Sequence, residues 1–224
     1  MIGDGGHGKI VRELIELTPD AVLAAVLDDR YAEPAKGKDG EFRFPVSAWR
    51  GLFERYPELE FIAAIGDNLL RQRIARELED AGARFARLIH PTAVVSARAK
   101  IGPGAVIMAR AVVQPDAAIG AHAIVNTGAI IEHDCVVGDC AHVAPGAIMT
   151  GGAEAGEGAL IGAGAVILPG RTLGAWSIAG AGAVVTRDVP PGYTAAGVPA
   201  AILPASPEPA FAPPQPAHQT TGKG

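Results

Sequence analysis

Apolar residues recur with a period of six over about 100 residues of the chain. From residue 89 to residue 190 the sequence divides into seventeen hexads without a break in phase, and the first position of every hexad is apolar. The fifth position is alanine in thirteen hexads; the exceptions are Cys135, Arg171, Ser177 and Val189. A six-residue period suits neither an amphipathic helix nor an alternating strand. It predicts short strands joined by turns, with the first-position side chains in a narrow core.

Stacking of these hexads predicts a solenoid. Three hexads make one coil of 18 residues, and successive coils bury a continuous aliphatic column. Glycine often follows the first position, where it supplies backbone freedom at a bend. A low-complexity Ala/Gly/Val segment would not keep its phase over this length. The pattern therefore predicts a parallel β-helix of nearly six coils over residues 88–190.

Residues 1–87 have α/β patterning instead. The segment Gly3-Asp4-Gly5-Gly6-His7-Gly8 fits GxGxxG and precedes a helical pattern over residues 9–17. A predicted strand, 22–27, ends in Asp28-Asp29. Glycines let the backbone approach phosphate, the helix N-terminus favours anions, and the acid can bind a ribose or base. This layout predicts a dinucleotide-type site; the alternative is a tight strand–helix turn without a ligand.

The rest of this segment also predicts an open sheet, with ligand-binding loops at the carboxyl ends of its strands. A second predicted strand, 61–65, runs into Gly66-Asp67-Asn68 and a helix over 69–82. The strand that should precede the glycines is reduced to Met1-Ile2. Either the true start lies upstream or a central strand is missing, and a missing strand would put the nucleotide site in doubt.

Composition narrows the functional classes. Apolar residues make up 49% of the chain but aromatic residues only 5%, as expected for a core of small aliphatic side chains. The net charge of −5 comes without a basic block, so neither nucleic acid nor a membrane surface is an expected partner. The sequence contains no long apolar run and no leader pattern. The two cysteines, Cys135 and Cys140, are interpreted as reduced thiols, and together these observations predict a cytoplasmic protein. The Pro-rich tail 204–224 is expected to be disordered.

The motifs together resemble one family. GGHGK, the DD pair, AIGDN and LIHPTA, followed by hexads, are similar to the sialic-acid O-acetyltransferase and bacillosamine/perosamine N-acetyltransferase group (NeuD/PglD-like). The resemblance covers residues 2 to about 200. It implies an α/β Rossmann-like N-terminal subdomain followed by a left-handed β-helix, with acetyl-CoA as cosubstrate and no metal. It also implies a homotrimer with active sites in clefts between neighbouring prisms. The handedness comes from the resemblance alone.

The resemblance also divides the chain by function. Residues 1–87 would bind the nucleotide-sugar, 88–190 would carry acyl transfer, and 191–203 would form a closing turn near CoA. In the family the GHG loop, the DD pair and the AIG glycine hold the nucleotide-sugar. The matching residues in this sequence are Gly6, His7, Gly8, Asp28, Asp29 and Gly66.

The candidate base lies in the repeat. Of the four histidines there, only His133 sits in a charged cluster, Glu132-His133-Asp134, and one coil in either direction places Pro115 and Gly151 beside it. Histidine has a suitable pKa for general-base catalysis, and a neighbouring carboxylate raises it and fixes the tautomer. Neighbours along a strand point to opposite faces, so a contact between His133 and Asp134 requires turn geometry.

By resemblance, His133 is the base and Asp134 tunes it. The resemblance also implies that the Gly151 amide donates to the oxyanion and that His142 contacts acetyl-CoA. Ala163 and Ala181 match positions that line the CoA groove. His90 and His122 are interpreted as structural or surface residues.

The predicted reaction is direct transfer of the acetyl group to the amine of a nucleotide-linked amino sugar for glycan synthesis. Cys135 falls at an inward bend, so a covalent acyl-enzyme is disfavoured. O-acetylation of a sugar such as sialic acid is the main alternative, because a hydroxyl needs the same base. A γ-type carbonic anhydrase would use three histidines, but the spacing of His122, His133 and His142 does not match its signature. A non-catalytic sugar-nucleotide sensor is the remaining alternative.

Overall fold

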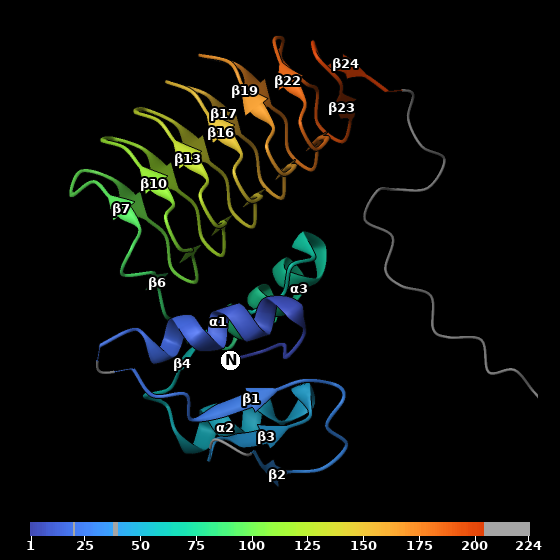
Figure 1. Cartoon of the computed structure of the whole chain (residues 1–224). Coiled ribbons are helices and arrows are strands. Elements are labelled where there is room, and N and C mark those ends of the chain that lie inside the picture. The colour runs from blue at the N-terminus through green and yellow to red at the C-terminus, as the bar shows by residue number, and fades with distance from the viewer. Residues whose placement is uncertain (20, 38–39, 204–224) are drawn as a thin grey trace, which may run out of the picture.

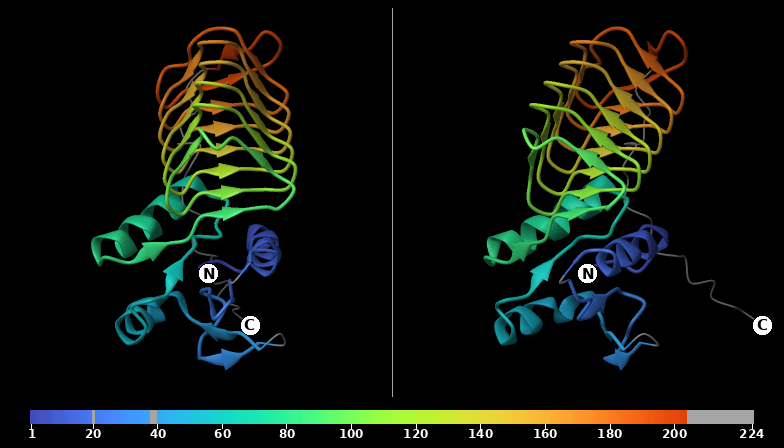
Figure 2. Two further views of the ribbon diagram at one scale, coloured as in Figure 1. Left: turned by 90° about the vertical axis from the view of Figure 1, so that its left-hand side faces the viewer. Right: turned by 60° about the vertical axis from the view of Figure 1, so that its left-hand side comes forward.

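The protein consists of an N-terminal unit (residues 1–87) and a three-sided prism of stacked coils; Figure 1 shows the coils rising from the N-terminal unit. The computed structural model describes residues 1–19, 21–37 and 40–203. The tail whose disorder the composition predicts, 204–224, lies outside the described residues. Both views of Figure 2 show the prism strands stacked into regular faces, with the N-terminal unit at the base.

Short strands, each of two residues except β23, build the three faces of the prism. The six-stranded sheet contains β7 (Val94–Val95), β10 (Val112–Val113), β13 (Ile130–Ile131), β16 (Ile148–Met149), β19 (Val166–Ile167) and β22 (Val184–Val185). The five-stranded sheet contains β8 (Lys100–Ile101), β11 (Ala118–Ile119), β14 (Val136–Val137), β17 (Glu154–Ala155) and β20 (Thr172–Leu173). The eight-stranded sheet contains β6 (Leu88–Ile89), β9 (Val106–Ile107), β12 (Ile124–Val125), β15 (His142–Val143), β18 (Leu160–Ile161), β21 (Ile178–Ala179), β23 (Thr194–Ala196) and β24 (Ala201–Ile202).

The register of these strands confirms the hexad pattern. Neighbouring strands pair in parallel with a shift of one coil, so that Ile131 lies beside Met149. Most first-position and fifth-position side chains form one continuous core, which includes Cys135; the first-position Ile89 is exposed. The predicted closing turn, 191–203, carries β23 and β24, which extend the eight-stranded sheet and pair antiparallel with each other.

The N-terminal unit is a small α/β layer. Its strands are β1 (Ala25–Leu27), β2 (Ala35–Lys36), β3 (Phe42–Phe44), β4 (Glu60–Phe61) and β5 (Arg84–Phe85). Its helices are α1 (Gly6–Glu16), the 3-10 turn η1 (Val46–Ala48), α2 (Trp49–Arg55) and α3 (Asn68–Asp80). The predicted first helix begins three residues earlier than the apolar pattern indicated, at Gly6, because the glycine loop itself enters the helix.

Ile2 supplies the reduced central strand. It forms parallel bridges to Leu27 on one side and to Ala63 on the other. Its N–H donates to the Ile62 carbonyl at 2.8 Å, and the Ala64 N–H donates to its carbonyl at 2.7 Å. Two residues therefore suffice to join the halves of the sheet and to place the glycine loop beside the loop that follows β4.

The N-terminal unit packs against the base of the prism. Val11 and Leu14 of α1 share a core with Val106 and Ile124 of the eight-stranded sheet and with Met108, which directly follows β9. This contact fixes the start of α1 relative to the prism, and with it the glycine loop. Within the described ranges, no helix is long and apolar enough to cross a membrane.

Candidate active site

A pocket of about 500 Å³ opens where the strands of the N-terminal unit end. The glycine loop, the end of β1, the segment 64–66 and one face of α3 line it. This is the crevice in which open α/β sheets bind ligands, where consecutive strands diverge to opposite sides of the sheet. Of the six residues predicted to bind the nucleotide-sugar, five line the pocket: Gly6, His7, Asp28, Asp29 and Gly66.

The sixth residue, Gly8, has a structural role in the loop. A Cβ at this position would lie 2.5 Å from the Gly3 carbonyl oxygen, so only glycine allows α1 to start this close to the loop. By contrast, a Cβ at Gly6 or Gly66 would meet no atom within 4 Å. The space beside these two glycines is open to a ligand.

His7 is neutral in this pocket. Burial and the nearby Arg71 cation lower its pKa to about 4. Its Nε2 is buried without a hydrogen-bond partner among the described residues. A neutral imidazole with an unused nitrogen can donate or accept one hydrogen bond to a substrate, but it does not supply a positive charge near pH 7.

The two acids of the DD pair are in different states. Asp28 Oδ2 accepts from the Asp4 N–H at 2.7 Å, and Oδ1 accepts from the Arg30 Nε at 2.9 Å. The hydrogen bond from Arg30 is the main cause that lowers the pKa of Asp28 to about 2. Asp29 is exposed and, in the described part of the chain, has neither an ion-pair nor a hydrogen-bond partner. Asp28 is therefore committed to holding the glycine loop, and Asp29 is the carboxylate available to a ligand.

Arg71, which the sequence analysis missed, holds the pocket against the prism. Its guanidinium is buried and donates to the Ile65 carbonyl at 2.8 Å in the N-terminal unit. It also donates to the carbonyls of His122 at 2.9 Å and Cys140 at 2.7 Å on the prism. Every partner is neutral, and burial lowers the pKa of Arg71 to about 10. An arginine in an amphipathic helix is normally expected on the exposed face, so nothing in the sequence indicates that Arg71 is buried.

His142 lies beneath the same loop. It stands between Ile124 and Leu160 in register, and its ring centroid is 6.5 Å from that of His7. The side-chain amide of Asn126, which the sequence analysis did not single out, contacts Nε2 at 3.0 Å. Burial, then Arg71 and His7, lower the pKa of His142 to about 4. The predicted CoA-contacting histidine and the predicted substrate loop are thus adjacent.

His133 lies on another part of the prism, at the corner between the six-stranded and five-stranded sheets. Its Nδ1 is 2.8 Å from Asp134 Oδ2, and both side chains are largely exposed. The contact between sequence neighbours is possible because Asp134 has φ +61°, a left-handed conformation at the corner where the chain turns from one face to the next. The hydrogen bond that His133 makes to the Asp134 carboxylate is the main cause that raises the pKa of His133.

Gly151 lies one coil along from His133, as the period predicts. A Cβ on Gly151 would be 2.7 Å from the His133 Nε2, so glycine leaves the space that the imidazole occupies. Within the described ranges no acceptor takes a hydrogen bond from the Gly151 N–H. This corner therefore presents a base nitrogen and a nearby unused amide donor.

Ala163 and Ala181 lie at a third location. They are exposed and stand one coil apart on the corner between the eight-stranded and six-stranded sheets, where the Gly182 N–H donates to the Ala163 carbonyl at 2.9 Å. Within one chain, the structure brings His7, Gly66 and His142 together and keeps His133, Asp134 and Gly151 together at a separate corner.

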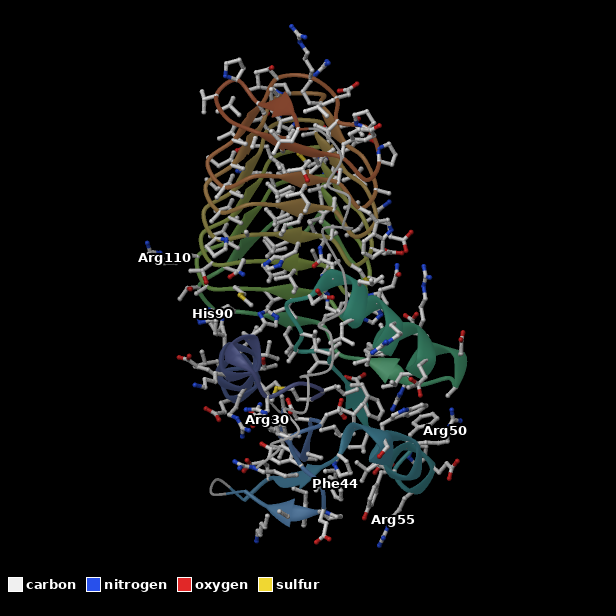
Figure 3. The ribbon with its side chains drawn as sticks, turned by 90° about the vertical axis from the view of Figure 1, so that its right-hand side faces the viewer. Arg30, Phe44, Arg50, Arg55, His90 and Arg110 are labelled. Atoms are coloured by element: carbon white, nitrogen blue, oxygen red, sulfur yellow. The ribbon has the colours of Figure 1, made fainter. Side chains whose placement is uncertain are left out.

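In the described part of the chain, the remaining histidines, His90 and His122, and the cysteine Cys135 have structural surroundings. His122 Nε2 contacts Glu79 Oε1 of α3 at 2.8 Å, and the His90 Nδ1 accepts from the Thr92 N–H at 3.0 Å. Figure 3 shows His90 at the base of the prism. Cys135 is buried, and burial raises the pKa of its thiol, which disfavours a thiolate nucleophile. Among the described residues no group of three histidine, cysteine or acidic side chains is arranged to hold a metal ion.

Comparison with known families identifies the N-terminal unit. Residues 1–78 match the sequence model of the PglD N-terminal domain. A curated relative, the UDP-N-acetylbacillosamine N-acetyltransferase of Bacillus subtilis (strain 168), is 46% identical over 109 residues. That alignment covers 49% of this chain and 50% of the relative, so the chain spans about half the length of the curated relative it matches.

Solved structures extend the similarity over both parts of the chain. PerB from Caulobacter crescentus, in complex with CoA and GDP-perosamine, is 40% identical with a TM-score of 0.83, over 91% of this chain and 95% of PerB. The acetyltransferase domain of PglB from Neisseria gonorrhoeae, in complex with acetyl coenzyme A, is 38% identical with a TM-score of 0.83, over 90% of this chain and 97% of that domain.

These matches confirm the predicted fold class, an α/β N-terminal part followed by a left-handed parallel β-helix. They also confirm the predicted resemblance, since the relatives are bacillosamine and perosamine enzymes. The chain belongs to the left-handed β-helix acetyltransferase family that includes the bacillosamine and perosamine N-acetyltransferases.

Proposed function

We propose that this protein transfers the acetyl group of acetyl-CoA to the amino group of a nucleotide-linked amino sugar, with His133 as general base. The observation that carries the proposal is the His133–Asp134 pair, held at an exposed prism corner with Nδ1 on the carboxylate and Nε2 over Gly151. When Nδ1–H donates to Asp134, Nε2 has the lone pair that accepts a proton.

The proposed chemistry is one direct displacement. The neutral amine attacks the thioester carbonyl, a C–N bond forms, and His133 Nε2 accepts the amine proton. The Gly151 N–H, unused among the described residues, is the proposed donor to the oxyanion. Collapse of the tetrahedral intermediate breaks the C–S bond and releases the CoA thiolate. Asp134 stabilises the imidazolium that forms during the reaction.

The acceptor is proposed to bind in the N-terminal pocket. Gly6 and Gly66 leave open space there, and Asp29 offers a carboxylate for an N–H or hydroxyl of the nucleoside. The names of the relatives favour N-acetylation over O-acetylation, because both the bacillosamine and the perosamine enzymes are N-acetyltransferases. Residues 1–87 thus form the proposed acceptor unit and 88–190 the acyl-transfer unit, with 191–203 near CoA.

A homotrimer is proposed because, within one chain, the residues proposed for catalysis and for binding acetyl-CoA lie on different parts of the prism. His133 lies at the six/five-strand corner, whereas His142 lies on the eight-stranded face beneath the substrate loop. Ala163 and Ala181, proposed to line the CoA groove, stand at the third corner of the same prism. The base of one prism can reach the acetyl group bound at another only if prisms stand side by side. We further propose a cytoplasmic role in supplying acetylated sugars for polysaccharide synthesis.

Release of CoA, followed with a thiol reagent, tests the proposal. Purified protein receives acetyl-CoA with UDP-, GDP- or dTDP-linked amino sugars, or with free sialic acid. We expect turnover on one nucleotide amino sugar and its loss in His133→Asn. His90→Asn is the matched control, because His90 is also a prism histidine but lies outside the proposed site.

Two results would contradict the proposal. Turnover on sialic acid alone would make the protein an O-acetyltransferase, and unchanged turnover in His133→Asn would remove His133 as the base. Sedimentation of the purified protein tests the trimer separately, and a monomer with full activity would exclude the shared site.

A further inference from the structure

Helix α3 presents two functional faces. Asn68 and Arg71 point to the prism, where the Asn68 amide donates to the Gly158 carbonyl at 3.0 Å. The opposite face lines the pocket with residues at positions i, i+3, i+4 and i+7, which share one side of a helix. These pocket residues are Leu70, Arg73, Ile74 and Glu77.

Among the charged side chains that line the pocket, one cation is available to contact a ligand. His7 is neutral near pH 7, because burial and Arg71 lower its pKa to about 4. Asp28, Asp29 and Glu77 are acidic; Asp28 is already paired with Arg30, and Glu77 accepts from the Trp49 Nε1 at 3.1 Å. Among the described residues that line the pocket, Arg73 is the one cationic side chain.

Arg73 is also uncommitted. It is exposed, and in the described part of the chain it has neither an ion-pair nor a hydrogen-bond partner. The neighbouring arginines differ: Arg71 is buried on carbonyl oxygens, Arg76 pairs with Glu157 at 2.7 Å, and Arg30 pairs with Asp28 at 2.9 Å. Figure 3 shows Arg55 at the end of the N-terminal unit opposite the prism.

We infer that Arg73 binds the diphosphate of the nucleotide-linked sugar. The inference rests on the proposed function and names the charged group that its pocket uses. A nucleoside diphosphate brings at least two negative charges into a pocket lined by three acidic side chains, of which only Asp28 is paired with an arginine, so a cation at the phosphates would offset the repulsion. The planar guanidinium of arginine donates two parallel hydrogen bonds to a phosphate.

This assignment separates three tasks within the pocket. Arg73 contacts the diphosphate, and Asp29 is left for hydrogen-bond donors of the nucleoside. Asp28 is a positioning residue that acts through the glycine loop, because both of its oxygens already accept hydrogen bonds from Asp4 and Arg30.

Calorimetric titration of the full chain with UDP, GDP, uridine and guanosine tests the inference. We expect Arg73→Ala to bind the preferred diphosphate about tenfold more weakly, the size of effect typical of a charge-assisted hydrogen bond. Binding of the matching nucleoside should change less than about twofold, because the lost contact is to phosphate. Arg76→Ala is the matched control, since it removes the same charge from a position of α3 that does not line the pocket and pairs with Glu157 instead.

The outcomes distinguish this inference from the proposed function. If Arg73→Ala binds the diphosphate as tightly as the unmodified protein, or loses the nucleoside equally, Arg73 is not a diphosphate ligand, whether or not acetyl transfer occurs. If the unmodified protein binds neither diphosphate and acetylates only free sugars, both proposals are overturned. A thermal melt of each variant checks that the exposed substitutions leave the fold intact.

Discussion

His133 and Asp134 are adjacent in sequence, yet the histidine Nδ1 lies 2.8 Å from the aspartate Oδ2. Consecutive side chains in a strand point to opposite faces, and this pair meets only because Asp134 has φ +61° at a corner of the prism. The corner therefore lets one dipeptide supply both the proposed base, His133, and the carboxylate that orients its imidazole. The proton-accepting Nε2 is left facing the next coil.

Removal of the base gives the first prediction. His133→Asn should lower kcat by about a thousandfold, within the range attributed to general-base catalysis. Binding of acetyl-CoA, measured by titration, should be nearly unchanged, because the imidazole acts mainly in the transition state. A loss confined to KM would contradict the proposed role.

The pH profile should depend on Asp134. Its hydrogen bond is the main cause that raises the pKa of His133, and the charge of Glu132 adds to the effect. The base must be neutral to accept a proton, so kcat/KM rises as pH rises through this pKa. Asp134→Asn should move that rise to lower pH and reduce the plateau, since the amide no longer stabilises the imidazolium. Measurement of kcat/KM from pH 5 to 9 checks this. If the rise of kcat/KM occurs at the same pH in Asp134→Asn, the ionisation of another group causes it.

Gly151→Ala should damage catalysis without unfolding the prism. The new methyl group would lie 2.7 Å from the His133 Nε2, and the exposed imidazole can move away from it. We expect kcat to fall at least about tenfold as the base leaves its position. The melting temperature should change by only a few degrees. Full activity in this variant would show that the imidazole does not work in the observed position.

Arg71 should dominate the stability of the junction. Arg71→Met would leave the carbonyls of Ile65, His122 and Cys140 without their buried donor. Unsatisfied buried acceptors cost about 1–3 kcal/mol each, so a loss of about 3 kcal/mol is expected in urea unfolding. Arg76→Met removes an exposed ion pair and should cost less than about 1 kcal/mol. Equal effects in the two variants would contradict the proposed role of Arg71.

Buried neutral histidines should make the fold acid-sensitive. The folded-state pKa values of His7 and His142 are about 4, below the ordinary 6.5. A histidine whose pKa is lower in the folded state binds a proton more readily in the unfolded state. The free energy of unfolding therefore falls as pH drops from about 6.5 to about 4. Urea unfolding at pH 7 and pH 5 measures this loss. His142→Gln should reduce it, and an unchanged pH dependence would mean that other groups cause it.

The hexad repeat made the prism predictable in detail. One small residue and one aliphatic residue per hexad decide which side chains point inward, and a coil of 18 residues places Gly151 beside His133 by counting alone. The α/β layer was predicted less completely, since β2, β3 and α2 have no clear apolar period. The apolar pattern predicts a start of α1 three residues late because glycines weaken the helical pattern.

The sequence by itself determined the β-helix, the glycine loop and the candidate base, because each depends on short-range spacing. Only the tertiary structure decided that Asp28 is committed to the loop while Asp29 is available, since that depends on contacts with Asp4 and Arg30. It also decided that Arg71 is buried and that Arg73, two residues on, lines the pocket. A helix turns by about 100° per residue, so residues two apart face different surroundings, and packing alone selects which side meets the prism.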